Sequence, residues 1–402
     1  MTAPLKNLRV LDLGWVMVGP MSGRYLADLG AEVFKVESSQ RIDPLRTLGP
    51  FKDGVPGPER SLSYHFINAG KRSITLDITS EGGREVIRSL AREVDVVIES
   101  FTPGVMEKLG LGYESLRADN PGLIMVSTCI LGQTGPAAGT SGVGTLGAAY
   151  AGASFLLGWP DRAPVGPYSA WTDSVAPRFV LASVLSALHR RKRTGEGCYI
   201  DVSQAEAGVQ FLLPAYFDFA ANGNIPQRAG NTPAPLRSPS GLYRCAGNDR
   251  WVAIDASRAD HWRALAELIG PVAADDRYAT LMGRLRHRAE LNALIEAWTS
   301  TRIDSEVEAT LQAQGIPAHM ACHAHDLDAD ADLAADEYLQ PVYDPVVGAV
   351  RNRGATFHIS PSAPERARPG PRIGDSTDAI LRDIAGMSPQ RISELRESGA
   401  LQ

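Results

Sequence analysis

The sequence predicts an α/β protein with a mostly parallel sheet and, after it, a smaller α+β region. Over the first 128 residues, short apolar runs alternate with segments whose apolar side chains recur at helical spacing. A stretch rich in Pro, Gly and Asn follows at 222–241, and two strand-like runs around a turn come next. Alternating strands and helices are typical of a parallel sheet with right-handed crossover connections.

The first strand, helix and strand lie at the N-terminus. Residues 8–13 form a short apolar run that ends at Gly14, and residues 19–30 keep helical spacing up to a terminal glycine. Residues 31–37 (AEVFKVE) predict a second strand. Three such elements in succession indicate one crossover unit of a parallel sheet.

The same alternation predicts the elements that follow. We expect a strand at 73–78, a helix at 81–94, a strand at 95–100, a helix near 113–118, a strand at 123–128 and a long helix at 174–191. Beyond these we expect an antiparallel hairpin formed by 242–245 and 251–256, and helices at 260–269, 287–299 and 303–314. The tail from Ile373 has a polar start and helical spacing, and we expect it to pack on the first domain.

Composition and charge narrow the classes of function. The chain has 402 residues and a formal net charge of −6, which disfavours a nucleic-acid-binding protein because such proteins usually present a basic face. Its four cysteines are widely spaced, so neither a disulfide framework nor a structural zinc site is expected. Since the chain shows no signal-like N-terminus and no membrane-length apolar run, we expect a cytoplasmic protein without membrane contact.

The first turn, Gly14 to Pro20, links a strand to a helix and invites comparison with dinucleotide-binding enzymes. Glu37 follows at about the spacing of a ribose-binding acid. The chain nevertheless lacks both the GxGxxG spacing and a GKS or GKT phosphate loop. A turn glycine followed by a proline near the helix start explains the pattern, and a nicotinamide enzyme remains the weaker alternative.

Other site signatures are weak. His319, Cys322, His323 and His325 lie close together, but no second pair of ligands stands at a spacing usual for zinc. We therefore expect a surface connection there and no metal site. The chain also has no GxSxG elbow, so a serine hydrolase is not indicated.

Asp173 stands at the head of the apolar segment 173–189. We expect it to be the N-cap of the helix, where backbone N–H groups and the positive end of the helix dipole stabilise a carboxylate. Aspartate is a common cap, and from this segment alone capping is the simpler interpretation. The same amides would also hold a carboxylate ionised and oriented for attack on a thioester.

Several segments in series resemble the class III coenzyme A transferases, the formyl-CoA and carnitine-CoA transferase family. The matching segments are VLDLGWVMVGPMSGRYLADLGAEVFKVE (10–37), NAGKRSITLDI (68–78), DVVIESFTPGVMEKLGLGYESL (95–116), NPGLIMVSTCILGQTGP (120–136), TDSVAPRFVLASVLSALHRRKRTGEGCYIDVSQAEA (172–207), RAGN (228–231), GIPA (315–318) and PRIGDSTDAILRDI (371–384). Each match alone is weak, but their order and spacing over nearly the whole chain are specific.

The resemblance implies a Rossmann-like large domain built from both ends of the chain, a smaller α+β domain, and two chains interlocked as a dimer. We expect residues 1–205 to form the N-terminal part of the large domain, 206–240 a linker, 241–330 the small domain, and 331–402 a return segment and C-terminal helix that complete the large domain. The assembly is expected to be a homodimer, or a heteromer with a paralogous subunit.

The resemblance also implies the chemistry. The family's catalytic aspartate falls on Asp173, which would attack a donor acyl-CoA to form a mixed anhydride and then an aspartyl-CoA thioester. Coenzyme A and its acyl esters are then substrates, and no permanently bound cofactor is expected. The partners are an acyl-CoA and a small carboxylic acid.

The family's coenzyme A contacts carry over to short segments of this chain. The implied binding residues are Met17, Val18, Ser100, Phe101, Thr102, Lys108, Ser141, Gly142, Val143 and Gly144. Lys108 stands where the family commonly has a basic residue near the nucleotide phosphates. Glycines in the segment 141–144 would let the backbone approach the thioester, and a merely flexible loop is the alternative interpretation.

Departures from the family pattern bear on the substrate. Met17 replaces a glutamine, Ser38 replaces an arginine, and the glycine-rich lid that closes on oxalate is not recognisable. Oxalate and formate are therefore not expected, and the side chains of Trp15, Val16, Met17 and Trp171 suit a roomier, more apolar acyl pocket. Residues 12–31 and the tripeptide before Asp173 are most similar to transferases that act on benzylsuccinate or related dicarboxylic acids with succinyl-CoA as donor.

Two alternatives share this fold. The α-methylacyl-CoA racemases use a His/Asp pair, and their histidine would fall soon after GQTGP, where residues 137–150 contain none. A structural subunit of a heteromeric transferase would tolerate a damaged site, and the retained Asp173 argues against that role.

Overall fold

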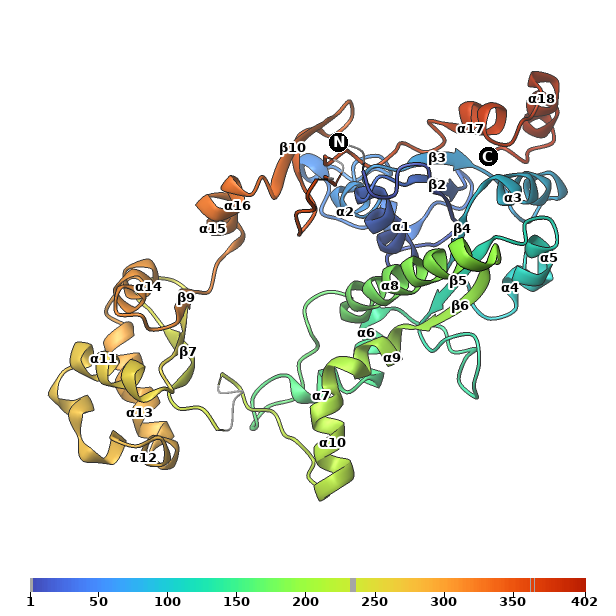
Figure 1. Ribbon diagram of the computed structural model, residues 1–402. Coiled ribbons are helices and arrows are strands. Elements are labelled where there is room, and N and C mark those ends of the chain that lie inside the picture. The colour runs from blue at the N-terminus through green and yellow to red at the C-terminus, as the bar shows by residue number, and fades with distance from the viewer. Residues whose placement is uncertain (1–2, 232–235, 362, 365) are drawn as a thin grey trace. The chain divides into compact units, whose positions relative to one another are not determined.

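The computed structural model describes residues 3–231, 236–361, 363–364 and 366–402, so residues 232–235 of the expected linker lie outside the described part. The chain forms two compact units, which are described separately (Figure 1). Unit 1 consists of Met1–Ser154, Gly166–Pro226 and Ala331–Gln402. Unit 2 consists of Phe155–Val165 and Gln227–Asp330.

A six-stranded sheet forms the centre of unit 1. Its strands are β1 (Arg9–Asp12), β2 (Glu32–Glu37), β3 (Arg72–Thr75), β4 (Val96–Glu99), β5 (Ile124–Cys129) and β6 (Cys198–Ser203). They lie in the order β3-β2-β1-β4-β5-β6, and every neighbouring pair is parallel. The predicted parallel sheet is confirmed, and its strand order is that of the doubly wound nucleotide-binding folds.

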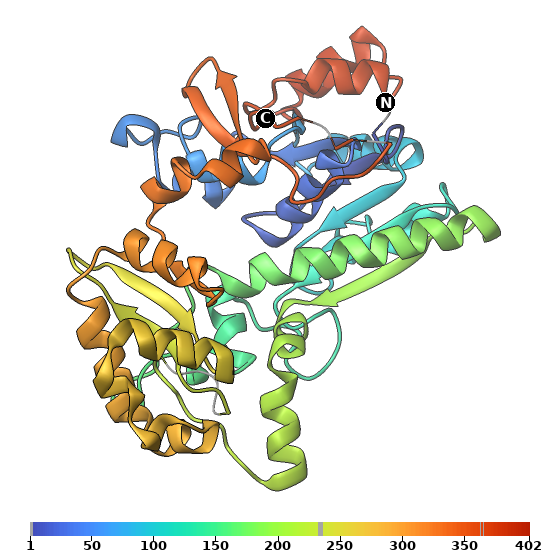
Figure 2. The same cartoon turned by 60° about the vertical axis from the view of Figure 1, so that its left-hand side comes forward.

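Helices cover both faces of this sheet. On one face lie α1 (Val18–Asp28) and the long α8 (Trp171–Thr194) (Figure 2). Their side chains, such as Leu26 and Val180, pack onto the sheet. On the other face lies α3 (Glu81–Glu93), whose start is capped by the Ser80 hydroxyl at 3.0 Å from the Gly83 N–H. Apolar side chains at helical spacing thus give each helix its buried stripe.

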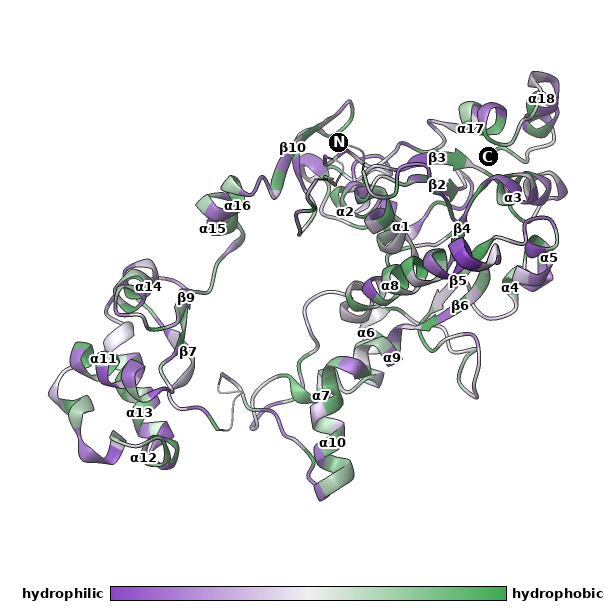
Figure 3. Ribbon diagram, in the orientation of Figure 1, coloured by the Kyte–Doolittle hydropathy of each residue, from purple (hydrophilic) through white to green (hydrophobic). Residues whose placement is uncertain are grey.

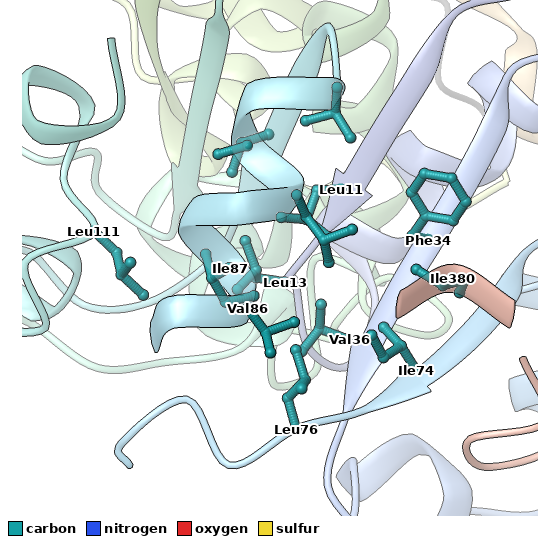
Figure 4. Packing of buried hydrophobic residues seen from close by; sticks show 14 of the residues in the cluster. Leu11, Leu13, Phe34, Val36, Ile74, Leu76, Val86, Ile87, Leu111 and Ile380 are labelled. Atoms are coloured by element: carbon teal, nitrogen blue, oxygen red, sulfur yellow. The ribbon is translucent and has the colours of Figure 1, made fainter. Parts of the chain in front are cut away.

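The C-terminal helices α17 (Thr377–Asp383) and α18 (Pro389–Glu397) share the face that α3 covers. Ile380 lies in the same buried cluster as Leu11 and Val86 (Figure 4). The Thr75 N–H donates to the Thr377 hydroxyl at 3.1 Å, so α17 is also tied to the edge strand β3 by a hydrogen bond. Unit 1 therefore uses both ends of the chain.

Shorter elements connect these layers. They are α2 (Leu62–Ile67), α4 (Val105–Lys108), α5 (Tyr113–Arg117), α6 (Gly144–Tyr150), α7 (Ala153–Leu156), α9 (Gln204–Val209), α10 (Leu213–Asn222), α16 (Ala331–Ala335) and the antiparallel hairpin of β10 (Leu339–Asp344) and β11 (Gly348–Arg353). Helix α10 is apolar over most of its surface and buries none of its residues (Figure 3).

Unit 2 combines a small antiparallel sheet with helices. Its elements are β7 (Ser240–Arg244), β8 (Trp251–Asp255), β9 (Ala318–Met320), α11 (Ala259–Ile269), α12 (Leu281–Arg286), α13 (Arg288–Thr299), α14 (Asp304–Ala313) and α15 (Ala324–Asp328). The predicted hairpin is confirmed by the antiparallel pairing of β7 with β8. Among the described residues, no helix combines the length and the apolarity that a membrane crossing requires.

Candidate active site

A cavity of about 410 Å³ opens at the carboxyl ends of β1, β2 and β4. It is lined by Leu13, Trp15, Val36, Glu37, Ser38, Arg41, Leu76, Asp77, Ile78, Thr79, Ser100, Phe101, Thr102, Val105 and Leu109. Strands β1 and β4 are neighbours whose connections run in opposite directions across the sheet. Ligands of open α/β sheets usually bind at such a switch point, so this cavity is the first candidate for a nucleotide-like ligand.

Hydrogen bonding and ring contacts join the two loops that flank this cavity. The backbone N–H of Trp15 donates to the Ser100 hydroxyl at 2.9 Å. The Trp15 ring meets the Phe101 ring edge-on at 6.5 Å, and the Arg41 guanidinium lies 4.8 Å from the centre of the indole. The cavity therefore has an aromatic wall with an exposed cation beside it, a combination that suits an anionic ligand with a flat ring.

The turn between β1 and α1 is strained. Val16 has a φ of 60°, a left-handed conformation that is costly for a β-branched residue. Its N–H donates to Asp43 Oδ1 at 3.1 Å, and the same oxygen accepts the Leu45 N–H at 3.0 Å. Asp43 Oδ2 lies 3.4 Å from Lys35 Nζ, and that ammonium also donates to the Gly14 carbonyl. A buried ion pair thus holds the strained turn on both sides.

A second buried ion pair supports the base of the turn. Lys71 Nζ donates to Asp12 Oδ2 at 2.6 Å, and Asp12 Oδ1 accepts the Gly14 N–H at 2.9 Å. Burial lowers the pKa of Lys71 to about 8 in spite of its carboxylate partner. Burial alone would also lower the pKa of Lys35, but the surrounding carboxylates outweigh it and raise that pKa. Two buried ion pairs, Lys35 with Asp43 and Lys71 with Asp12, therefore stabilise the turn.

Asp173 is not the N-cap of α8, so that prediction is wrong. The helix begins at Trp171 with Ala170 as the cap residue, and Asp173 lies within the first turn. Its carboxylate accepts instead from the N–H of Gly144, the first residue of α6, at 3.1 Å. Asp173 is only 5% exposed, so the carboxylate is held inside the protein by a neighbouring helix start.

The environment makes the Asp173 carboxylate unusually basic. Burial raises its pKa to about 6, while the hydrogen bonds from the Gly144 N–H and from the Gln204 side chain act to lower it. At pH 7 such a carboxyl is still about ten parts ionised to one part protonated. Pro177 has no N–H for the Asp173 carbonyl four residues earlier, which loosens the helix at Asp173.

Gly144 approaches Asp173 so closely that only glycine fits. A Cβ at this position would lie 2.6 Å from Asp173 Oδ2 and 2.9 Å from the Ala170 Cβ. The Thr172 hydroxyl donates to the Gly144 carbonyl at 3.0 Å. The starts of α6 and α8 are therefore joined by two hydrogen bonds around the carboxylate.

The structure brings some of the expected binding residues together. Ser100, Phe101 and Thr102 line the cavity, and Gly144 contacts Asp173. Val18 is buried against α8 beside Val175 and Ala176, while Met17 packs partly against Met21 and Tyr64. Ser141, Gly142 and Val143 are exposed just before α6. Lys108 is exposed at the end of α4 and is not among the residues that line the cavity. Its neighbours Val105 and Leu109 line it instead.

Sequence reasoning missed four polar residues of this region, Arg41, Lys35, Asp43 and Gln204. A signal existed for one of them, because Lys35 stands between the apolar residues Phe34 and Val36 of a predicted strand. Asp43 precedes a proline, as turn residues often do, but this pattern does not predict that its carboxylate accepts the Val16 N–H. Gln204 lies in a segment that matches the family pattern, but only the fold places it against Asp173.

In unit 2, the histidines near the end of the small sheet do gather. Ligand atoms of His323, His325 and Asp326 lie within 4.8 Å of one another. Asp326 is already bound by Arg250 at 2.8 Å and accepts the His323 N–H at 2.7 Å. His323 Nε2 lies 3.2 Å from the Asp249 carbonyl. These groups have protein partners and serve as the cap of α15, and the absence of a metal site remains a prediction.

Comparisons with known proteins agree with this arrangement. The family model described as CoA-transferase family III matches residues 5–377. Succinyl-CoA–D-citramalate CoA-transferase from Chloroflexus aurantiacus is 33% identical over 98% of this chain and 97% of its own length. Acetyl-CoA:oxalate CoA-transferase from Acetobacter aceti is 34% identical over 95% of this chain and 96% of its own length. A crystal structure of a CAIB/BAIF family protein from Brucella suis matches with a TM-score of 0.87 at 33% identity, covering 96% of this chain and 100% of that one.

Proposed function

The chain belongs to CoA-transferase family III, and from this premise we propose that Asp173 is the nucleophile through which it moves coenzyme A from a donor acyl-CoA to a small carboxylic acid. The observation that carries the proposal is the buried Asp173 carboxylate with its raised pKa and its two hydrogen-bond donors. A buried carboxylate is poorly solvated and therefore more nucleophilic, yet this one stays ionised near neutral pH.

The first half of the proposed reaction loads coenzyme A onto the protein. An Asp173 oxygen attacks the thioester carbon of the donor, the C–S bond breaks, and a mixed anhydride forms with release of the CoA thiolate. The thiolate then attacks the aspartyl carbonyl carbon, so that the donor acid leaves as a carboxylate and an aspartyl-CoA thioester remains. No net proton transfer is required, and the site must chiefly align the groups and exclude water.

The second half repeats these steps in reverse. The acceptor carboxylate attacks the aspartyl thioester and expels the thiolate, which gives the anhydride of the acceptor with Asp173. The thiolate attacks the acceptor carbonyl, and the new acyl-CoA leaves with Asp173 free again. In this scheme the Gly144 N–H, 3.1 Å from one Asp173 oxygen, stabilises the charge that develops on that oxygen.

We assign the nucleotide end of coenzyme A to the cavity at the switch point of the sheet. Trp15 and Phe101 offer ring surfaces there, and Arg41 places a positive charge at its edge. The cation supports this assignment because a phosphate ester needs charge complementarity. Ser38, which also lines the cavity, stands where the family has an arginine but carries no charge, so we assign the positive charge near the phosphates to Arg41.

For the substrates, we propose a succinyl-CoA-type donor and a dicarboxylic acid larger than oxalate as acceptor. Overall identity does not select the acid, since a citramalate transferase and an oxalate transferase are 33% and 34% identical to this chain. The selection rests on Met17 and Trp171, whose large apolar side chains stand beside the starts of α1 and α8. A racemase is disfavoured because residues 137–150 contain no histidine.

Trapping the aspartyl intermediate tests this proposal. Incubation with an acyl-CoA and hydroxylamine, followed by peptide mass spectrometry, should reveal a hydroxamate on Asp173, and Asp173→Ala should lose coenzyme A transfer by at least a factor of about 10³. Asp161→Ala, at an exposed aspartate of unit 2, is the matched control. Full activity in Asp173→Ala would refute the assignment of the nucleophile.

A further inference from the structure

Gln204 lies against the proposed nucleophile, and the mechanism above uses it only as a hydrogen-bond donor to Asp173. It is the first residue of α9, directly after β6, and it is only 5% exposed. Its side chain hydrogen-bonds to Asp173 and lowers the pKa of that carboxyl. An ionised carboxylate only accepts hydrogen bonds, so the group that faces Asp173 must be the side-chain amide Nε2–H.

The orientation of this amide leaves its oxygen unused. Gln204 Oε1 is buried and has no hydrogen-bond partner among the described residues. The Thr128 hydroxyl is a second buried atom in the same condition. Thr128 pairs in register with Val202 on β6, two residues before Gln204, and it lies on the same side of β5 as Val126, which packs beneath α8. Two orphaned polar atoms therefore lie on neighbouring elements near the start of α8.

Orphaned acceptors of this kind are costly and are rare in native proteins. One that lies beside a reaction centre can be satisfied by the bound substrate. On the proposed function, the reaction brings two groups with hydrogen-bond donors to Asp173, the acceptor acid and the pantetheine arm of coenzyme A, which carries amide N–H groups.

We propose that Gln204 is a second residue of the reaction centre, donating from Nε2 to the Asp173 carboxylate and accepting at Oε1 a hydrogen bond from an O–H or N–H donor of the bound substrate. The inference rests on the proposed function and deepens it, because it names a feature of the substrate. A hydroxyl next to a carboxyl of the acceptor acid supplies such a donor, and so does a pantetheine amide. The relative that transfers coenzyme A to D-citramalate, a hydroxy acid, shows that the family includes acids of the first kind.

The hydrogen bond that Gln204 donates to Asp173 can be measured through the pKa of Asp173, because few other groups affect that pKa. The causes that shift its pKa are burial, the Gly144 N–H and the Gln204 side chain, and no charged group of the described chain is among them. Of the elements that contact α8, α6 carries Tyr150, α9 carries Glu206 and β6 carries Tyr199 and Asp201, all of them exposed. Helix α1 carries Tyr25 and the ion pair of Arg24 with Asp28, and none of these groups is among the causes that shift the pKa of Asp173. Removing the Gln204 amide should therefore raise the pKa of Asp173 further.

The first experiment measures kcat/KM against pH for the wild-type protein and for Gln204→Met, which keeps the side-chain length without hydrogen-bonding groups. The acid limb should move upward by roughly one pH unit and kcat should fall about tenfold. Gln204→Asn keeps an amide and should recover part of both effects. Gln390→Met, on the exposed surface of α18, should behave as wild type.

The second experiment identifies the donor of the substrate. Wild type and Gln204→Met are compared with two acids that differ by one hydroxyl, citramalate and methylsuccinate. If the acid hydroxyl is the donor, wild type should prefer citramalate by about tenfold and the variant should lose that preference. If the pantetheine amide is the donor, the acid ratio should stay constant while the KM for every acyl-CoA rises about tenfold in the variant.

An unmoved acid limb together with unchanged KM values and acid ratio in Gln204→Met would overturn the inference, and would mean that a water molecule alone satisfies the oxygen. Failure of the proposed function has a different signature, in which the wild-type protein itself transfers no coenzyme A to either acid. Thermal unfolding of each variant establishes that loss of activity is not loss of fold.

Discussion

Burial of the Asp173 carboxylate leads to a specific pH dependence. On the proposed mechanism Asp173 must be ionised, and burial raises its pKa to about 6, so kcat/KM should fall tenfold per unit as the pH drops below about 6. The sign follows from the protonation state, because the protonated acid cannot attack and the loss therefore occurs on the acid side. Steady-state kinetics across the stability range of the protein would measure the limb. A limb near pH 4 would show that Asp173 titrates as an exposed aspartate does.

A single methyl group at Gly144 should damage the site. In Gly144→Ala the new Cβ would lie 2.6 Å from Asp173 Oδ2, so either α6 or the carboxylate must move. Since small displacements of a nucleophile are costly, we expect kcat to fall by about a hundredfold or more with the fold retained. Gly139→Ala is the control, because a Cβ there meets nothing within 4 Å. Equal activity of the two variants would contradict the close approach.

The site was only partly accessible to sequence reasoning. Asp173 and the loop at 100–102 were predicted as site residues because they lie in segments that resemble a known family. Gln204 and Asp43 were not found, because their roles depend on Asp173 and Val16, which are distant in sequence and adjacent only in the fold. A buried polar group is recognised by its partner, and the partner is a property of tertiary structure.

Among the structural elements, the strained turn between β1 and α1 gives a further prediction. Val16→Gly removes the cost of a positive φ and should change the free energy of unfolding by less than about 1 kcal/mol. Because glycine allows more backbone conformations, the turn between the cavity and α8 would be less rigid, so kcat/KM should fall about tenfold. Activity assays and denaturant titrations of the same samples separate the two effects.

Val55→Gly, at an exposed loop valine with negative φ, serves as the control for that experiment. A Val16→Gly protein with wild-type kinetics would show that the strain has no part in function.

Helices and strands with strong periodicity were predictable, and the exceptions have physical causes. The first five strands of the sheet are mostly buried apolar runs, as the sequence analysis expected. Strand β6 escaped notice because it alternates half-buried and exposed residues at the edge of the sheet. The start of α8 was placed too late, since the actual cap residue, Ala170, is not of a capping type, whereas Asp173 is. The partner of the Asp173 carboxylate comes from α6.

At the level of the whole molecule, exposed apolar residues predict self-association, in line with the dimer that the family resemblance implies. Around α10 large side chains are more than half exposed, namely Phe211, Tyr216, Phe217, Phe219 and Ile225. Patches of this kind usually mark an interface. We expect a dimer by analytical ultracentrifugation, shifted toward monomer by the double change Phe217→Asp and Phe219→Asp.

The matched control is Val55→Asp, which adds a charge at another exposed apolar side chain. A wild-type protein that sediments as a monomer at all concentrations would refute this prediction, and co-purification of a homologous subunit would indicate a heteromer.

The discontinuous path of unit 1 has a consequence for biosynthesis. Thr75 and Thr377 are bonded although 302 positions separate them, and Ile380 and Leu395 fill the same cluster as residues of β1 and α3. A ribosome delivers these C-terminal side chains last, after all of unit 2 has emerged. Until then the face that α3 covers stays partly open, because α17 and α18 are still missing from it. We expect the growing chain to need protection from aggregation during synthesis, and nonsense mutations near the end of the gene to give aggregated protein rather than a shortened enzyme.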